Sequence, residues 1–423
     1  MRGLLAALLL LAGAATANEF TTLKGHGGPI MGLAVAPSGQ VASASFDNAV
    51  GLWDGRHPTW LDGHEAAVIA LAFGPDGGLY SGGDDFTLRS WHGGEQRLLG
   101  RHEAKITSIA VRADGAELAT GSWDATVRLW NPATGANRDL QSPGAGVNAV
   151  AYGSDGAIFA ATAAGALWRY DGENRLPLVQ QGFGINQIVV GDAWVAYGAV
   201  DGVTRVVDAQ TGAALHDFTL DRRPILAMAH HRASGQIAVG DGHGYIMLID
   251  TAEWRITKDF RAAQHGPVWA LAFSPDGNTI YAGGLDDVVY AWPTALLDRF
   301  DPGISGERSF LREADTMPNG ERQFMRKCSI CHDVTAGPSR KAGPTLHGVF
   351  GRPAGSVPGY RYSNTLTGTG LIWTEATIDA LFHEGPDNYI PGSKMPMQVI
   401  AGPEDRADLI AYLKTATMEE TKP

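Results

Sequence analysis

The sequence is poor in cysteine, in excess positive charge and in long hydrophobic runs. Its 423 residues include two cysteines, Cys328 and Cys331, so a framework of several disulfides is excluded. The chain has 33 Lys and Arg against 45 Asp and Glu, a net charge of -12, and we therefore do not expect nucleic acid as a partner. The apolar run Leu4 to Leu11 is well short of the roughly 20 residues that span a bilayer, so we expect no membrane-spanning helix.

The N-terminus has the features of a secretory signal. Arg2 precedes the apolar run, and Ala15-Thr16-Ala17 stands before Asn18 as a small-residue cleavage site. We therefore expect residues 1–17 to be a signal peptide and the mature protein to be periplasmic. A membrane anchor is the alternative, but the run is too short for it.

The two cysteines lie in the segment Cys328-Ser329-Ile330-Cys331-His332. C-x-x-C-H is the attachment motif of covalently bound haem, because thiols one helical turn apart can each join one vinyl group of a porphyrin. The following histidine then lies under the iron. We predict one covalently attached haem c with its iron; a thioredoxin-like redox pair and half of a zinc site are the alternatives. Haem attachment would use both thiols and leave none for a disulfide.

Further motifs follow the cysteines in order: Gly343-Pro344-Thr345-Leu346-His347-Gly348, Gly351-Arg352, Trp373, the loop from Tyr389 to Met395, and the segment Asp408 to Lys414. From about Gly320 to Lys414 the chain resembles class I cytochrome c of the mitochondrial type. The resemblance implies His332 and Met395 as iron ligands and the Pro344 carbonyl as acceptor for the far nitrogen of His332. It also implies contacts with the haem propionates from Arg352, Tyr362 and Trp373.

The sixth ligand has competitors nearby. Met397 lies two residues beyond Met395, and His347 and His383 could also reach an iron. The turn Pro391-Gly392-Ser393-Lys394 favours Met395, whose soft thioether stabilises ferrous iron and closes the site to substrates. The sequence departs from the family at Leu381 and Leu366, which replace a tyrosine and an asparagine, so we expect few polar groups on the methionine side. Leu409, Ile410 and Leu413 form the apolar stripe of a helix that begins after Gly402-Pro403.

The region before this domain repeats itself. His26, His64 and His102 lie 38 residues apart, and Trp53, Trp91 and Trp130 recur at nearly the same spacing. A period of about 40 residues with Gly-His and Trp-Asp ends is typical of four-stranded propeller blades. Turn triplets recur within the units, at 37–39, 75–77, 113–115, 154–156, 233–235 and 275–277. The closing positions predict seven blades: Trp53, Trp91, Trp130, Tyr170, Val207, Ile249 and Trp292.

These units resemble a WD-repeat β-propeller. The family has a buried network of the opening histidine, a turn aspartate and the closing tryptophan. By this resemblance the histidines His26, His64, His102 and His265 and the aspartates Asp47, Asp85, Asp124 and Asp286 are structural. The units that end at Tyr170, Val207 and Ile249 lack the histidine, and only the second retains the aspartate, as Asp201. Two explanations of this loss stay open, namely neutral sequence drift and a functional face on these three blades. We expect Glu19 to Leu23 to close the ring as the outer strand of the last blade.

The predicted organisation is thus a signal peptide (1–17), an all-β seven-bladed propeller (18–292), a linker (293–319) and an all-α cytochrome c domain (320–423). Leu296, Leu297 and Phe300 give the linker an apolar part that could dock on either domain. From Glu307 onward 13 Lys and Arg oppose 14 Asp and Glu, so nearly all of the net negative charge lies on the propeller side. An acidic propeller would attract redox partner proteins with basic surfaces, although solubility alone would also explain the charge.

We therefore expect a periplasmic cytochrome that transfers single electrons, with the propeller as a docking platform for redox partners. We do not expect an enzyme, because the sequence offers no Ser/His/Asp set, no paired carboxylates and no clustered metal ligands. Two alternatives stay open. One is an oxidoreductase subunit whose propeller carries a substrate site, and the other is a redox-sensing or assembly scaffold.

Overall fold

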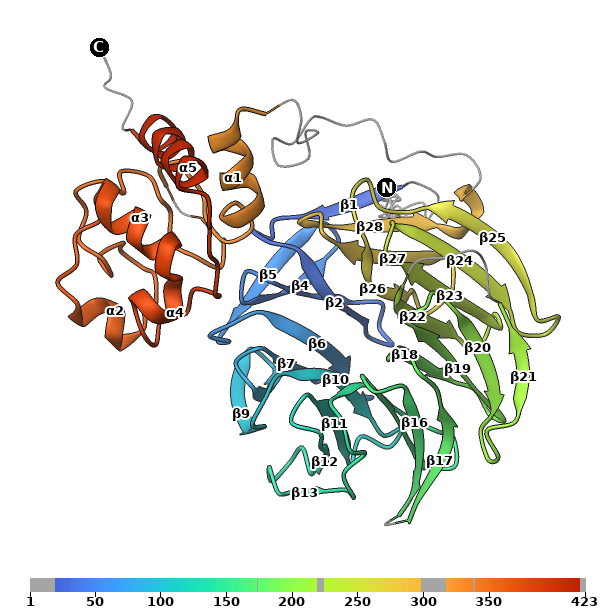
Figure 1. The fold of residues 1–423 in the computed structure, drawn as a ribbon. Coiled ribbons are helices and arrows are strands. Elements are labelled where there is room, and N and C mark those ends of the chain that lie inside the picture. The colour runs from blue at the N-terminus through green and yellow to red at the C-terminus, as the bar shows by residue number, and fades with distance from the viewer. Residues whose placement is uncertain (1–19, 173, 219–223, 298–316, 338, 419–423) are drawn as a thin grey trace, which may run out of the picture.

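The computed structural model describes residues 20–172, 174–218, 224–297, 317–337 and 339–418. The predicted signal peptide, with Phe300 and most of the predicted linker, lies outside these residues. The described chain forms a propeller and a helical domain, which lies beside the propeller next to β5 (Figure 1). No described helix is both long and apolar enough to cross a bilayer.

The propeller consists of seven antiparallel sheets of four strands each, which confirms the blade count expected from the repeats. Blade one consists of β2 (Ile30–Val35), β3 (Val41–Ser45), β4 (Ala49–Asp54) and β5 (His57–Asp62). Blade two consists of β6 (Val68–Phe73), β7 (Leu79–Gly83), β8 (Thr87–His92) and β9 (Glu95–Arg101). Blade three consists of β10 (Ile106–Val111), β11 (Leu118–Ser122), β12 (Val127–Trp130) and β13 (Asn137–Asp139).

The fourth to sixth blades keep this architecture although their sequences have lost the repeat signature. Blade four consists of β14 (Val147–Tyr152), β15 (Ile158–Thr162), β16 (Ala166–Asp171) and β17 (Asn174–Gln180). Blade five consists of β18 (Ile185–Val190), β19 (Trp194–Ala199), β20 (Thr204–Asp208) and β21 (Ala214–Asp217). Blade six consists of β22 (Ile225–His231), β23 (Gln236–Asp241), β24 (Tyr245–Asp250) and β25 (Arg255–Arg261).

The seventh blade closes the ring with a strand from the other end of the propeller sequence. Its sheet has the order β1 (Thr21–Lys24), β28 (Val288–Pro293), β27 (Thr279–Gly284) and β26 (Val268–Phe273). Thr21 pairs with Ala291, and Lys24 pairs with Val288. The N-terminal strand is therefore the outer strand of the last blade, as predicted, and it covers an edge that would otherwise stay unpaired.

The repeat positions explain the packing. The seven closing residues all lie on the third strand of their blade in chain order, or on β28 in the last blade, and all are buried. The turn triplets place their glycines at φ values of 63° to 89°, where a side chain would be strained. The innermost strands β2, β6, β10, β14, β18, β22 and β26 are neighbours around the ring.

The C-terminal domain contains five helices among the described residues: α1 (Asn319–Lys327), α2 (Asn364–Gly368), α3 (Glu375–Glu384), α4 (Pro386–Tyr389) and α5 (Pro403–Ala416). The expectation of an all-α domain holds only approximately, because long loops connect these few short helices and Pro353 forms an isolated β-bridge with Ile372. Loops have to wrap a ligand cavity that helices alone would leave open.

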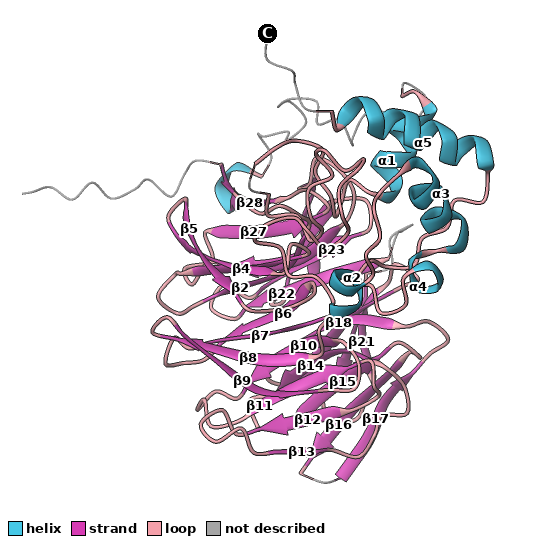
Figure 2. Ribbon diagram, turned by 90° about the vertical axis from the view of Figure 1, so that its left-hand side faces the viewer, coloured by secondary structure: helices cyan, strands magenta, loops and turns pink. Residues whose placement is uncertain are grey.

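Helices α1 and α5 cross closely. A side chain at Gly320 would collide with the backbone of Asp408, and the rings of Phe324 and Tyr412 lie 5.4 Å apart. α5 begins after Gly402 and buries Leu409 and the rest of the predicted stripe. After the last blade, the short 3-10 helix η1 (Thr294–Leu296) leads to Leu297, which packs into the core of that blade and so confirms docking for this part of the linker. Figure 2 shows helices α1 to α5 gathered on one side of the propeller.

Candidate functional site

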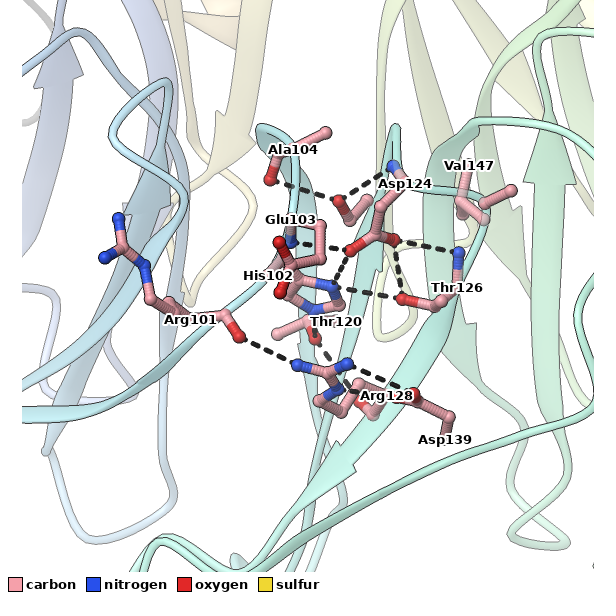
Figure 3. Close-up of polar contacts among 12 residues, drawn as sticks. Arg101, His102, Glu103, Ala104, Thr120, Asp124, Thr126, Arg128, Asp139 and Val147 are labelled. Carbon is pink, nitrogen blue, oxygen red and sulfur yellow. Dashed lines mark hydrogen bonds and ion pairs between the residues drawn. The ribbon is translucent and has the colours of Figure 1, made fainter.

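The propeller histidines form saturated networks. In blade three, the Nδ1 atom of His102 lies 2.8 Å from Asp124, and its Nε2 atom lies 2.7 Å from Thr120 (Figure 3). The indole N–H of Trp130 donates to the same threonine oxygen at 2.8 Å. His26 in blade one and His64 in blade two make the corresponding contacts, with Ser43 and Ser81 in the place of Thr120. The predicted structural role of these three histidines is confirmed.

The fourth predicted histidine differs. His265 is part-exposed, and its Nδ1 atom lies 3.6 Å from Asp286, beyond hydrogen-bond distance. Ala282 occupies the position of the serine or threonine, so the network has no hydroxyl to join, and the indole of Trp292 donates to the Ala262 carbonyl instead. Asp286 accepts from the Tyr290 hydroxyl at 2.8 Å. The prediction of a complete network in this blade is therefore wrong.

Blade six shows a residue that the repeat pattern missed. Asp241 is buried at the end of β23, where it accepts from the backbone N–H groups of His243 and Tyr245. It lies before the expected aspartate position, so a search at fixed spacing does not find it. Asp201 in blade five accepts from Val203 N–H at the expected position. These carboxylates hold turns together.

The candidate ligand site is a cavity of about 550 Å³ that is lined by the helical domain and, at one border, by residues of the first two blades. Cys328 and Cys331, from the turn that ends α1, line it together with His332. Its walls include the apolar side chains of Leu346, Val349, Ile378, Phe382, Ile390 and Leu413, which come from loops and from helices α3 and α5. A mainly apolar cavity of this size is typical of a site for a small molecule or cofactor.

His332 is partly buried and oriented by one backbone contact. Its Nδ1 atom lies 2.8 Å from the carbonyl oxygen of Pro344, as predicted for the Nδ1–H tautomer. Burial lowers the pKa of this imidazole, so the ring stays neutral and its Nε2 lone pair is free to bind a metal. Gly343 makes this position possible, because a side chain there would collide with the imidazole ring.

Met395 lines the same cavity as His332. Its backbone N–H donates to the Ser393 hydroxyl, and its side chain is partly buried and lines the cavity. Met397 is 48% exposed and does not line the cavity, so the geometry favours Met395 over this competitor. Leu366 and Leu381, the two departures from the family, also line the cavity. His347 and His383 lie outside the cavity lining.

The three side chains expected at the propionates all line the cavity. The Arg352 guanidinium donates to the backbone carbonyls of His347 and Thr345, at 2.6 and 2.8 Å. The Tyr362 hydroxyl accepts from Val357 N–H, and Trp373 lies in the surrounding core. Tyr360, which sequence reasoning missed, also lines the cavity and donates to the Ala342 carbonyl at 2.7 Å. Their contact with propionates stays a prediction.

The donor set fits a covalently attached haem. Burial raises the pKa of Cys328 to about 12 and also raises that of Cys331. Reactive redox cysteines have lowered pKa values, so the environment argues against the thioredoxin-like alternative. One neutral histidine nitrogen, one thioether and two cysteines border a single apolar space, which is the chemistry that haem c requires.

Comparisons with known proteins agree for the C-terminal domain. Residues 318–417 match the cytochrome c family. Over 100 residues the chain is 48% identical to cytochrome c of Sesamum indicum and 45% identical to that of Nigella damascena, in each case 23% of this chain and 88% of the relative. Cytochrome c of Ginkgo biloba is 44% identical over 101 residues, 24% of this chain and 88% of the relative.

Four segments of the propeller, residues 18–54, 56–92, 93–131 and 256–293, match the WD domain, G-beta repeat. They correspond to blades one to three and the last blade. The crystal structure of the WD40 β-propeller domain of Doa1 superimposes with a TM-score of 0.59 at 20% identity, covering 65% of this chain and 95% of that domain. This likeness shows the fold of the propeller.

Proposed function

The chain belongs to the cytochrome c family through its C-terminal domain, which follows a seven-bladed WD40 propeller, and from this premise we propose that it is a periplasmic carrier of single electrons. The family implies a haem c held by thioether bonds to Cys328 and Cys331. When bound, the haem supplies one-electron chemistry at its iron. The WD40 propeller suggests interaction with other proteins, and we propose that these are redox partners.

The observation that carries this proposal is the presence of His332 and Met395 on the same apolar cavity as the two cysteines. In the proposal, His332 binds the iron through Nε2, because Nδ1 is already bonded to Pro344. Met395 supplies the sixth ligand. If His332 and Met395 both held the iron, the protein would leave no position on the metal for a small substrate, and the domain would transfer electrons without catalysing a reaction of its own.

The remaining cavity residues orient and insulate the site. Leu366 and Leu381 exclude water from the thioether side, which favours the less charged ferrous state over the ferric state. Burial lowers the pKa of Arg352, but its guanidinium keeps its charge and is held by two backbone carbonyls. We propose that this charge and the hydroxyl of Tyr362 orient the propionates.

The periplasmic location is supported by the predicted signal peptide and by the chemistry of attachment, since haem c is joined to bacterial proteins outside the cytoplasm. Cell fractionation tests it: we expect the haem-containing chain in the periplasmic fraction with Asn18 as its first residue. Haem-loaded chain that keeps residues 1–17 and stays in the cytoplasm would contradict the proposal.

Redox titration of the full-length protein tests the electron-carrier role. We expect one reversible one-electron step and no change of the visible spectrum on addition of cyanide within the mixing time. Immediate cyanide binding, or steady turnover of a small substrate without a partner protein, would contradict a closed electron carrier and favour an oxidoreductase.

A further inference from the structure

The propeller and the cytochrome domain meet through a polar interface beside the haem cavity. Arg340 pairs with Asp62 of β5 at 2.7 Å, and its guanidinium lies over the ring of Trp60, 4.1 Å from the centroid. Lys394 pairs with Glu65 at 3.5 Å. In both pairs the acid belongs to the propeller and the base to the cytochrome domain. The interface therefore joins a negatively charged propeller surface to a positively charged surface next to Met395.

The backbones of the two domains also approach closely. A side chain at Gly27 would collide with the backbone of Arg340 and Lys341. Glu65 and Glu103 occupy the same position in blades two and three, where all three backbone N–H groups donate to the turn aspartate. The propeller therefore accepts a side chain at this position, and the glycine in blade one is needed by the contact between domains.

Blade two extends this contact over the cavity. The turn Asp84-Asp85-Phe86 lines the cavity together with Cys331, and so does Glu65. Phe86 has a φ of 67°, in the left-handed region that bulky residues rarely occupy. The same turn position is Asn48 in blade one and Ala125 in blade three. A phenylalanine held in this conformation at a cavity wall indicates that its ring has a role there.

We propose that blades one and two are the docking surface for the haem face of the chain's own cytochrome domain, and that they cover the haem while the domains are together. This inference rests on the proposed electron-carrier function. It identifies the propeller of the same chain as a binding partner of the cytochrome domain. The acidic propeller supplies the complementary surface within the same polypeptide. A bulky redox protein then exchanges electrons at this face only after the two domains separate.

The interface is built for reversible contact. Asp62 and Glu65 have side chains 70% and 57% exposed, and Arg340 and Lys394 are about one third exposed. Exposed ion pairs are weak and are screened by salt, so such a contact opens readily. Domains of one chain are expected to move relative to one another unless a large, apolar interface joins them.

The variant Gly27→Ala tests the docking, with Gly182→Ala as its control. Gly182 lies three residues before β18, as Gly27 does before β2, and a side chain there would have open space. The readouts are the radius of gyration by X-ray scattering and the oxidation rates of the ferrous full-length protein. The oxidants are a blue-copper protein, which is bulky, and ferricyanide, which is small.

We expect Gly27→Ala to increase the radius of gyration and to raise the blue-copper rate about fivefold or more, because a misplaced methyl group in a packed contact shifts the equilibrium by at least that factor. The ferricyanide rate should change much less. Gly182→Ala should match the wild type in all readouts. Equal blue-copper rates and equal radii for both variants and the wild type would overturn the proposal.

A charge exchange gives a second test that does not depend on one glycine. Asp62→Arg alone should raise the blue-copper rate about two- to fivefold by breaking one exposed pair, and the double variant Asp62→Arg with Arg340→Asp should restore it. No rescue would overturn the pairing. In every variant the haem spectrum and the reversible one-electron step should persist; if these are missing from the wild type, it is the electron-carrier function that fails.

Discussion

The two domains use histidine in opposite ways. His102 of the propeller has both ring nitrogens bonded, to Asp124 and to Thr120. His332 of the cytochrome domain bonds to Pro344 through Nδ1, and its ring lines an apolar cavity. The first arrangement closes on itself and stabilises a blade. The second leaves one nitrogen available, and a neutral imidazole nitrogen at a cavity wall is what a metal site needs.

The comparison teaches that burial alone does not identify a ligand. Desolvation lowers the pKa of both imidazoles, so both are neutral near pH 7. They differ in how many of the two ring nitrogens receive a hydrogen-bond partner from the protein. A carboxylate on one nitrogen and a hydroxyl on the other complete the hydrogen bonding of His102, whereas the Pro344 carbonyl occupies only one nitrogen of His332 and leaves Nε2 for the proposed iron bond.

The largest difference should come from removing each histidine. We expect His332→Ala to abolish the low-spin spectrum of the haem, because the iron loses its proximal ligand, and to abolish reversible one-electron transfer with it. His102→Ala should leave the spectrum unchanged. Visible spectra of the two purified variants check this, and a normal low-spin spectrum in His332→Ala would break the comparison.

The stability of the propeller should show the reverse order. His102→Ala leaves the buried hydroxyl of Thr120 and the carboxylate of Asp124 without their partner, which should reduce the free energy of unfolding by about 2–3 kcal/mol. Denaturant unfolding followed by tryptophan fluorescence measures this. His265→Ala is the matched control, since His265 makes no hydrogen bond with Asp286 in the described structure, and it should cost less than about 1 kcal/mol.

A smaller effect should follow from removing one donor of the same network. Trp130→Phe deletes the N–H group that donates to Thr120 and keeps most of the apolar volume, so we expect a loss of about 1 kcal/mol. The same unfolding experiment applies. A loss as large as that of His102→Ala would mean that the indole packing, and not the histidine, holds the blade together.

The smallest effect concerns pH. Burial lowers the folded-state pKa of His102, so its contribution to stability is complete above the unfolded value of about 6.5 and decreases as the pH falls below it. Hydrogen bonds outweigh burial at Asp124 and lower its pKa to about 2, so a second loss begins below about pH 4. The stability difference between wild type and His102→Ala should therefore shrink as the pH falls from 7 to 5. A difference that grows would contradict a neutral His102.

Repeats and motifs allowed much of this structure to be predicted from sequence. The spacing of His26, His64 and His102 identified the blades because each unit has to bury the same side chains, and Cys328, Cys331 and His332 form a local motif. The pattern failed where one member was replaced. Ala282 removes the hydroxyl from the last blade, so His265 is left outside any network, and Asp241 acts from a shifted position.

The interface between the domains could not be predicted in the same way. Arg340 and Asp62 are 278 residues apart, and neither lies in a motif. Exposed charges are common on both domains. Composition could therefore suggest that the two domains attract one another, but not which residues pair across the interface. The role of Phe86 could not be predicted either. The residue after the turn aspartate is left-handed in each of the first three blades, and only the fold shows that in blade two its side chain meets the cavity.

The identity of the sixth ligand tests the account most directly. Ferric haem bound by methionine has a weak charge-transfer band, which can be recorded for the wild type, Met395→Ala and Met397→Ala. We predict that the band is present in the wild type, absent in Met395→Ala and retained in Met397→Ala. A band that survives in Met395→Ala, or that is lost in Met397→Ala, would contradict the assignment of a closed His332 and Met395 site.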